Sequence, residues 1–265
     1  MTQMALDALI ALAGQAGSPD YFSDWAVQTS KTLIAADGGA EALLTLGHVP
    51  RLLVGDFDSI RPQTRQQLAG LSESLTFPRD KDYTDGELAV AASVLLALGM
   101  DPAEIALADP QGHALYQAFE TAGDLTGRSF IFLDYGGRRL DHQLANVALA
   151  RILALRGALV FMTDGTSLAR LISGPADMKE VFPEDCFRKA RDQAPETSFH
   201  FSLLALDDGV TDLTLKGLEW ELDGLRLPMG RSQGLSNRPR GAYPLDLSLK
   251  LSAGSLLAYT YPRDL

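Results

Sequence analysis

Residues 52–59 read LLVGDFDS, a short apolar run that leads directly into a glycine and two aspartates, Asp56 and Asp58. A short apolar run bounded by turn residues is typical of a buried strand in a parallel sheet. Ligands of open parallel sheets bind beyond the carboxyl ends of the strands, which is where residues that follow such a run are placed. The stretch therefore predicts a parallel sheet with two carboxylates at its ligand-binding edge.

The same kind of pattern extends on both sides of this stretch, up to about residue 160. Apolar runs predict strands at residues 8–13, 32–36, 52–54, 130–133 and 159–162, although a short helix would also fit the first of them. Residues 86–100 and 142–155 have helical periodicity, the second with one apolar face that consists of Leu144, Ala148, Ile152 and Leu155. The alternation predicts an α/β fold, with a Rossmann-like parallel-sheet domain over residues 1–162.

After about residue 165 the pattern changes to short strand-like runs separated by Gly, Pro, Asn and Asp. In the run PLDLSLKL, leucines at every second position from Leu245 to Leu251 alternate with polar residues. This period is that of a half-buried antiparallel strand, so we expect a smaller C-terminal β-sandwich domain over residues 163–265. The polar residues 173–198 are expected to form an excursion or a mobile loop.

Composition excludes several classes of protein. The chain has 265 residues, 46% of them hydrophobic, which suits two modest domains with a sizeable core. A net charge of −11 argues against non-specific nucleic-acid binding, which needs a dense Lys/Arg surface. One cysteine, Cys186, excludes an internal disulfide, and we expect a buried thiol in a reducing compartment. No apolar run is long enough for a membrane helix, so we expect a soluble cytoplasmic protein.

Carboxylates recur directly after the predicted strands and before the first predicted helix. They are Asp37, Asp56, Asp58, Asp134 and Asp164 after strands, and Asp80, Asp82 and Asp85 in RDKDYTDGE. A convergent acidic group is a natural host for Mg²⁺, which prefers carboxylates, water and phosphate oxygens. For Asp134 and Asp164 we favour a turn or capping role, and Thr84 with Glu87 fits a helix capping box.

Residues 136–146, GGRRLDHQLAN, form a second polar motif at the start of a predicted helix. Arg139 supplies donors suited to a phosphate oxygen, and the helix N-terminus adds backbone N–H groups; alternatively Asp141 simply caps the helix. The sequence contains no GxxxxGK[ST], GxGxxG or GxSxG motif, and its four histidines lack metal-ligand spacing. Serine hydrolases and zinc enzymes are therefore not supported.

Taken in order, AADGGA, GDFDS, KDYTDGELA and RLDHQLAN resemble the motif series of the thiamine pyrophosphokinase family. FSLLAL, LKGLEWEL and GLSN are similar to its C-terminal signatures, so the resemblance spans about residues 9–259. It implies an α/β catalytic domain, a β-sandwich thiamine-binding domain and a homodimer with active sites between subunits. The implied reaction transfers the pyrophosphoryl group of ATP to the hydroxyl of thiamine, which yields thiamine diphosphate and AMP.

The resemblance also implies roles for individual residues. The implied catalytic residues are Asp56, Asp58, Asp85, Arg139 and Asp141, with Mg²⁺ held by Asp56, Asp58, Asp82 and Asp85. The implied nucleotide-binding residues are Asp37, Lys81, Thr84, Arg138, His142 and Asn146. The implied thiamine-binding residues are Trp220, Ser236 and Asn237.

The chain departs from the family pattern at four places. The G-G-R-x-D-H element is one residue longer here, so either Arg138 or Arg139 can take the phosphate role. Arg238 stands where an acidic residue often follows Ser-Asn, and residues 109–128 and the polar stretch around Cys186 resemble insertions. Two alternatives stay open: a pyrophosphokinase for another alcohol such as a hydroxymethylpterin, and a non-catalytic regulator that binds thiamine or a nucleotide.

Overall fold

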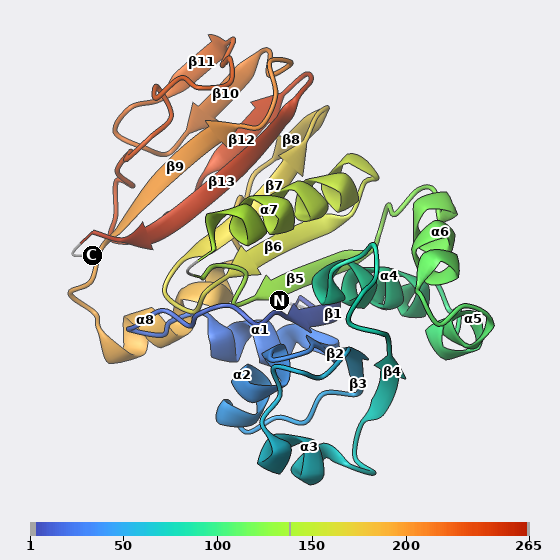
Figure 1. Cartoon of the computed structure of the whole chain (residues 1–265). Helices are drawn as coiled ribbons and strands as arrows, with labels where there is room; N and C mark the ends of the chain where they lie inside the picture. The colour runs from blue at the N-terminus through green and yellow to red at the C-terminus, as the bar shows by residue number, and fades with distance from the viewer. Residues whose placement is uncertain (1–3, 138, 264–265) are drawn as a thin grey trace.

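The computed structural model describes residues 4–137 and 139–263, and within them the strands form two sheets (Figure 1). The order of the larger sheet is β4-β3-β2-β1-β5-β6-β7-β13-β9, and that of the smaller is β11-β10-β12-β8. The strands of the larger sheet are β1 (Leu6–Ala11), β2 (Ser30–Ala36), β3 (Leu52–Gly55), β4 (Glu73–Thr76), β5 (Ser129–Leu133), β6 (Leu159–Thr163), β7 (Leu168–Ser173), β9 (Phe199–Ala205) and β13 (Ser255–Pro262). Those of the smaller sheet are β8 (Ala176–Met178), β10 (Leu213–Lys216), β11 (Leu222–Leu225) and β12 (Ser248–Leu251).

Helices cover both faces of the larger sheet. They are α1 (Ser23–Thr29), α2 (Gly39–Thr45), α3 (Pro62–Leu68), α4 (Asp85–Ala97), α5 (Pro102–Ala108), α6 (His113–Thr121), α7 (Leu140–Leu155) and α8 (Arg188–Gln193), preceded by a short 3₁₀ helix, Glu184–Phe187. On one face α4 packs against β1 to β3 and α7 against β6 and β7, and on the other α1 and α2 pack against β1 and β2. Alternate residues of β1 therefore enter two separate cores. Leu9 packs in the core on the side of α1 and α2, and Ile10 packs in the core on the side of α4.

All five strands predicted from apolar runs are confirmed, and the first is a strand rather than a helix. The predicted helices correspond to α4 and α7. The strands from β1 to β6 pair in parallel, which confirms the doubly covered parallel sheet. Strand β4 was not predicted, because three of its four residues are exposed and the run ESLT has no apolar pattern.

The antiparallel strands predicted for the C-terminal third are confirmed, but they divide between the two sheets. Strands β9 and β13 pair with each other and extend the larger sheet beyond β7, whereas β10 and β12 belong to the smaller sheet. Phe201 and Leu256 from the larger sheet share one core with Leu215 and Leu249 from the smaller. The sandwich is thus made by the end of the large sheet and the small sheet. Because β6 pairs with β7, the large sheet continues across the predicted domain boundary at residue 162.

The apolar face predicted for residues 142–155 is the face that α7 leaves exposed. Leu144 and Leu155 are 61% and 50% exposed, whereas Leu149 and Leu153 are buried against the sheet. Leucines and alanines occupy both sides of this helix, so periodicity alone could not show which side faces the core.

The two segments that resemble insertions are folded. In residues 173–198, Phe182, Cys186 and Phe187 are buried, which confirms the buried thiol and makes this segment a packed excursion. Burial raises the pKa of the Cys186 thiol. Helix α6 lies in the other segment and packs against α4, with Tyr116 stacked on Tyr83 at 4.3 Å between ring centroids. Among the helices of the described residues, none combines the length and apolar character needed to cross a membrane.

Candidate active site

A pocket of about 780 Å³ opens at the carboxyl ends of the central parallel strands. Its walls come from the segments that follow β1, β2, β3 and β5 and from the first turns of α4 and α7. This is the edge at which an open parallel sheet binds its ligands. The chain therefore places Asp37, Asp56, Asp58 and Asp85 and the described part of the GGRRLDH motif around one cavity.

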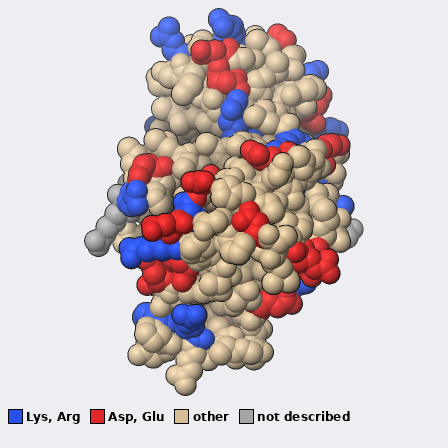
Figure 2. Space-filling view, turned by 45° about the vertical axis from the view of Figure 1, so that its right-hand side comes forward, with Lys and Arg blue, Asp and Glu red and all other residues tan. Residues whose placement is uncertain are grey.

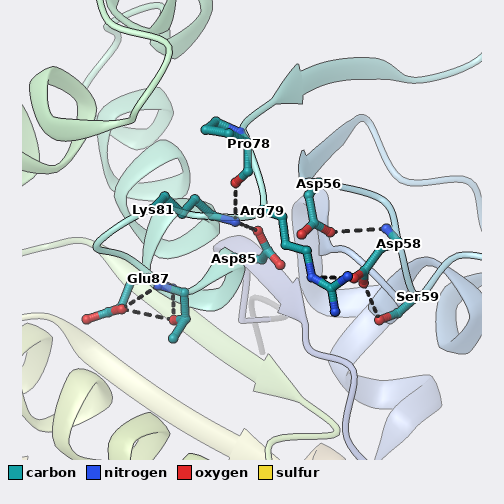
Figure 3. A network of polar contacts seen from close by, with 9 residues as sticks. Asp56, Asp58, Ser59, Pro78, Arg79, Lys81, Asp85 and Glu87 are labelled. Carbon is teal, nitrogen blue, oxygen red and sulfur yellow. Dashed lines mark hydrogen bonds and ion pairs between the residues drawn. The ribbon is translucent and has the colours of Figure 1, made fainter.

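Three carboxylates converge on one side of the pocket. Asp37, Asp56 and Asp58 each offer an oxygen within 4.8 Å of the others, an arrangement that fits a single cation. The loop that carries Asp56 and Asp58 is held by local hydrogen bonds: the Asp58 N–H donates to Asp56 at 3.1 Å, and the Ser59 hydroxyl donates to Asp58 at 3.0 Å (Figure 3). Arg79 lies 3.5 Å from Asp58 across the loop.

Asp85 joins this group from the start of α4. A β-carbon placed on Gly55 would lie 3.0 Å from the Asp85 carboxyl carbon and 3.3 Å from Asp37 Cβ, so both side chains meet at this glycine. The ammonium of Lys81, only 5% exposed, lies 2.9 Å from Asp85 and donates to the Pro78 carbonyl (Figure 3). Burial raises the pKa of Asp37 and of Asp85, and neighbouring carboxylates raise both further.

The N-terminus of α4 faces the pocket and is capped as predicted. Thr84 Oγ1 accepts the Glu87 N–H at 3.1 Å, and the Thr84 N–H donates to the Glu87 carboxylate at 2.8 Å. Thr84 and Gly86 also line the pocket. Capping and exposure to a ligand thus coincide in one turn, as a phosphate-binding helix start requires.

The GGRRLDH motif lies on the opposite side of the pocket. Arg139, the N-cap residue of α7, donates to Asp141 at 2.6 Å, and this bond lowers the pKa of Asp141. Asp141 therefore pairs with the arginine and does not cap the helix. His142 and Asn146 line the pocket, and Asn146 donates to the Tyr135 carbonyl at 2.9 Å. Arg138 lies outside the described residues.

Asp82 lies apart from the other predicted metal ligands. Its side chain is 80% exposed, lies 3.0 Å from His113 on α6, and is absent from the described residues that line the pocket. It ties the loop before α4 to the segment that resembles an insertion. The remaining predicted ligands, Asp56, Asp58 and Asp85, all line the pocket.

The three predicted thiamine-binding residues lie together at the far edge of the large sheet. Asn237 is buried and bonds to the backbone of Trp220 in both directions, at 3.2 and 2.7 Å. Ser236 lies 3.2 Å from the Tyr261 hydroxyl. The Trp220 ring is 53% exposed, and Arg238 lies over it at 5.5 Å, so this tryptophan is a surface platform rather than a core residue.

Two family models match the chain. One, described as "Thiamin pyrophosphokinase, catalytic domain", matches residues 24–157, and the other, "Thiamin pyrophosphokinase, vitamin B1 binding domain", matches residues 191–242. The chain belongs to the thiamin pyrophosphokinase family. Most pocket residues fall inside the first match, and Trp220, Ser236 and Asn237 fall inside the second.

Individual members of the thiamin pyrophosphokinase family are distant in sequence and close in fold. A Bacillus subtilis thiamine pyrophosphokinase is 24% identical over 205 residues, which are 77% of this chain and 76% of that protein. The structure of thiamin pyrophosphokinase from Candida albicans has 18% identity and a TM-score of 0.71 over 97% of this chain and 89% of that one. The Bacillus subtilis structure has 20% identity and a TM-score of 0.65 over 98% and 100%.

Asp134 has the left-handed backbone of a turn residue, with φ of +53°, but its side chain does not hold the turn as that of Asp164 does. Asp164 does hold a turn, since its Oδ1 accepts the Thr166 and Ser167 N–H groups. Asp134, by contrast, is among the residues that line the pocket, and its buried Oδ1 has no hydrogen-bond partner in the part of the chain that the structure describes. No sequence signal distinguishes the two residues, because both simply follow an apolar strand.

Charges on the surface are mixed. Figure 2 shows Lys and Arg side chains scattered among Asp and Glu on the face that it presents, without a continuous basic area on that face. The mixed surface and the net charge of −11 do not suit binding to a nucleic-acid backbone, which needs a dense Lys/Arg surface. They agree with membership of the thiamin pyrophosphokinase family.

Proposed function

We infer that this chain transfers the pyrophosphoryl group of ATP to the hydroxyl group of thiamine, giving thiamine diphosphate and AMP. One observation carries this inference: Asp37, Asp56, Asp58 and Asp85 converge on one pocket. The matches to the catalytic and vitamin-binding models of the thiamin pyrophosphokinase family support it. Phosphoryl-type transfer depends mainly on positioning and electrostatic stabilisation, so a pocket without a nucleophilic side chain suits the reaction.

The acidic group fits a magnesium ion. Three carboxylates share a space 4.8 Å wide, and Asp37 has a buried oxygen without a hydrogen-bond partner among the described residues. Hard oxygen ligands of this kind are those that Mg²⁺ prefers. Mg²⁺ held by Asp56 and Asp58, with Asp37 and Asp85 beside them, would neutralise charge on the ATP phosphate oxygens.

Cationic side chains of the pocket would act on the same phosphates. Arg79 and Arg139 are exposed at the pocket wall and can pair with phosphate oxygens. Lys81 is held against Asp85, which fixes the position of that carboxylate. The oxygen of the thiamine hydroxyl attacks the β-phosphorus, its proton passes to a carboxylate of the pocket, the bond between that phosphorus and the oxygen shared with the α-phosphate breaks, and AMP leaves with the electron pair.

The predicted thiamine-binding residues lie far from the acidic residues of their own chain. Asn237 pairs with Phe201 beside β9, which is seven strands away from the strand that leads to Asp56. At the usual strand spacing this separation is roughly 33 Å, too far for one small acceptor to contact both places. We propose a homodimer in which Trp220, Ser236 and Asn237 of one subunit complete the pocket of the other.

One surface suits such a dimer. Leu140 and Leu144 on α7 are 65% and 61% exposed, and on the neighbouring face of the sheet Leu204 is exposed while Tyr259 and Tyr261 are partly so. Figure 1 shows α7 lying over β6 and β7, and β13 and β9 follow β7 in the same sheet. Exposed apolar groups on adjoining elements are typical of an interface between subunits.

A cytoplasmic location is likewise proposed, because a lone buried thiol fits a reducing compartment.

A product assay tests the function and its alternatives. The protein is incubated with ATP, Mg²⁺ and thiamine, or with hydroxymethylpterin in place of thiamine, and AMP and the product are measured by mass spectrometry. We expect AMP and thiamine diphosphate in equal amounts, no product from the pterin, and loss of both products in Asp56→Asn. Asp177→Asn, which removes an exposed carboxylate on β8, serves as the matched control. Pterin diphosphate, or nucleotide binding without AMP, would support one of the alternatives instead.

A further inference from the structure

The carboxyl group of Asp134 has no structural task in this fold. It follows β5, is 4% exposed and lines the pocket, and its Oδ1 lacks a hydrogen-bond partner among the residues of known position. A buried polar atom left unpaired is destabilising, so such atoms in a pocket are typically matched by a ligand. Asp134 therefore has an unpaired carboxyl oxygen in a residue that lines the pocket.

The surroundings of Asp134 favour a neutral ligand group. The charged groups that act on it are both acids, Asp164 in the next loop and Asp20 in the segment before α1. Asp164 is occupied by the N–H groups of its turn, and Asp20 lies 3.1 Å from Lys189. Burial, followed by these two acids, raises the pKa of Asp134 to about 7. At neutral pH much of the protein carries a carboxylic acid here, which has one O–H donor and one carbonyl acceptor.

Part of the wall next to Asp134 is made of backbone. A β-carbon on Gly14 would lie 1.8 Å from the Asp134 carbonyl oxygen, so the two loops touch without a side chain between them. Gly136 and Gly137 follow on the same wall, and no atom lies within 4 Å of a β-carbon built on Gly136. Open space beside a side-chain-free wall is suited to a flat ring.

The position of Asp134 along the sheet edge matches the far end of a nucleotide. Its strand, β5, is three places from β3, which leads to Asp56 and Asp58, so the two ends of the pocket are about 14 Å apart. A nucleoside triphosphate with its outer phosphates at the acidic group extends over such a distance.

We propose that Asp134 recognises the amino edge of the adenine ring of ATP. Its carbonyl oxygen accepts a hydrogen bond from the exocyclic amine, and its O–H donates to the adjacent ring nitrogen. Asp134 is thus a specificity-determining residue for the nucleotide, an assignment that rests on the proposed function of the same pocket.

The test compares ATP with purine riboside triphosphate, which differs only by lacking the exocyclic amine. Equilibrium binding and kcat/KM are measured for the unaltered protein, for Asp134→Ala, and for Asp134→Asn, whose amide retains one donor and one acceptor. A two-point contact to a base discriminates by roughly tenfold to a hundredfold, so we expect a preference of that size for ATP in the unaltered protein and in Asp134→Asn. In Asp134→Ala the ratio should fall to about one.

Two results would overturn the proposal. One is an unchanged preference for ATP in Asp134→Ala. The other is a preference that shifts only when thiamine is replaced by its analogue without the pyrimidine amine, because Asp134 would then contact the acceptor. Both are distinct from failure of the proposed function, in which the unaltered protein would form no AMP from ATP and thiamine while the binding comparison could still be made.

Discussion

The carboxyl carbon of Asp85 would lie only 3.0 Å from a β-carbon built on Gly55. The glycine also has φ of +145°, a conformation that side chains rarely adopt. The last residue of β3 is thus small because an acid from α4 packs against it. The acidic group is held together from two sides of the sheet edge.

Gly55→Ala should therefore disable the site while the fold persists. The added methyl group displaces Asp85, and a shift of about 1 Å in a catalytic group costs on the order of a hundredfold in rate. Turnover is measured as AMP formation, and folding by circular dichroism. Gly47→Ala is the matched control, because Gly47 also has positive φ, +82°, but its β-carbon would meet no atom within 4 Å. Equal losses in the two variants would contradict a specific role for the Asp85 contact.

Removal of one acid should abolish stabilisation by magnesium. A ligand present at about 100 times its dissociation constant stabilises the folded state by about 2.7 kcal/mol, which corresponds to a rise in Tm of roughly 5–10 °C for a chain of this size. We expect this rise with Mg²⁺ and ATP in the unaltered protein and at most a small one in Asp58→Asn. Thermal unfolding with Mg²⁺ or with EDTA provides the measurement, and Asp177→Asn should behave as the unaltered protein does.

The buried acid Asp134 should make stability fall as pH rises. Its pKa is about 7 in the folded protein and about 4 when unfolded, so between these values the folded state binds the extra proton. Stability from this group is fully present below pH 4 and is lost as pH rises through 7. Asp134→Asn should match the unaltered protein at pH 4 and exceed it by roughly 4 kcal/mol at pH 8, measured by urea unfolding. A difference that does not change with pH would contradict the assignment.

Two inactive variants should restore activity when combined, if sites are shared between subunits. Asp56→Asn damages the nucleotide side and Trp220→Ala the thiamine side, so a mixed dimer has one site with both changes and one with neither. Equal mixing after unfolding and refolding should recover about a quarter of normal activity at low thiamine concentration. Mixing Asp56→Asn with Asp58→Asn, both on the nucleotide side, should recover none. No recovery in the first mixture would place both sides of the site in one chain.

The sequence predicted the parallel half of the fold well because its strands are short apolar runs buried on both faces. The ends of those strands also located the acidic group, since topology alone brings Asp37, Asp56 and Asp58 to one edge. The prediction was weaker where one sequence pattern is compatible with two arrangements of the strand. Alternating leucines such as Leu249 and Leu251 show that one face of a strand is buried, but not which sheet the strand joins.

The site was only partly predictable for similar reasons. Asp134 and Asp164 follow comparable strands, and only packing decides that Asp164 holds a turn while Asp134 is left unpaired. The exposed position of Asp82 depends on His113, which lies 31 residues later and reaches it through the fold of α6. Such contacts between distant residues leave no local signal.

The order of strands in the large sheet also bears on how the protein is made. Strand β13 lies between β7 and β9, although it is synthesised after both. On the ribosome β9 therefore has no neighbour in the sheet until residues 255–262 have emerged, and until then the open edge of β7 is available to other chains. We expect nascent chains to need protection during this interval, and a ribosome-bound chain arrested before residue 255 to bind chaperones more strongly than one arrested after β13 is free.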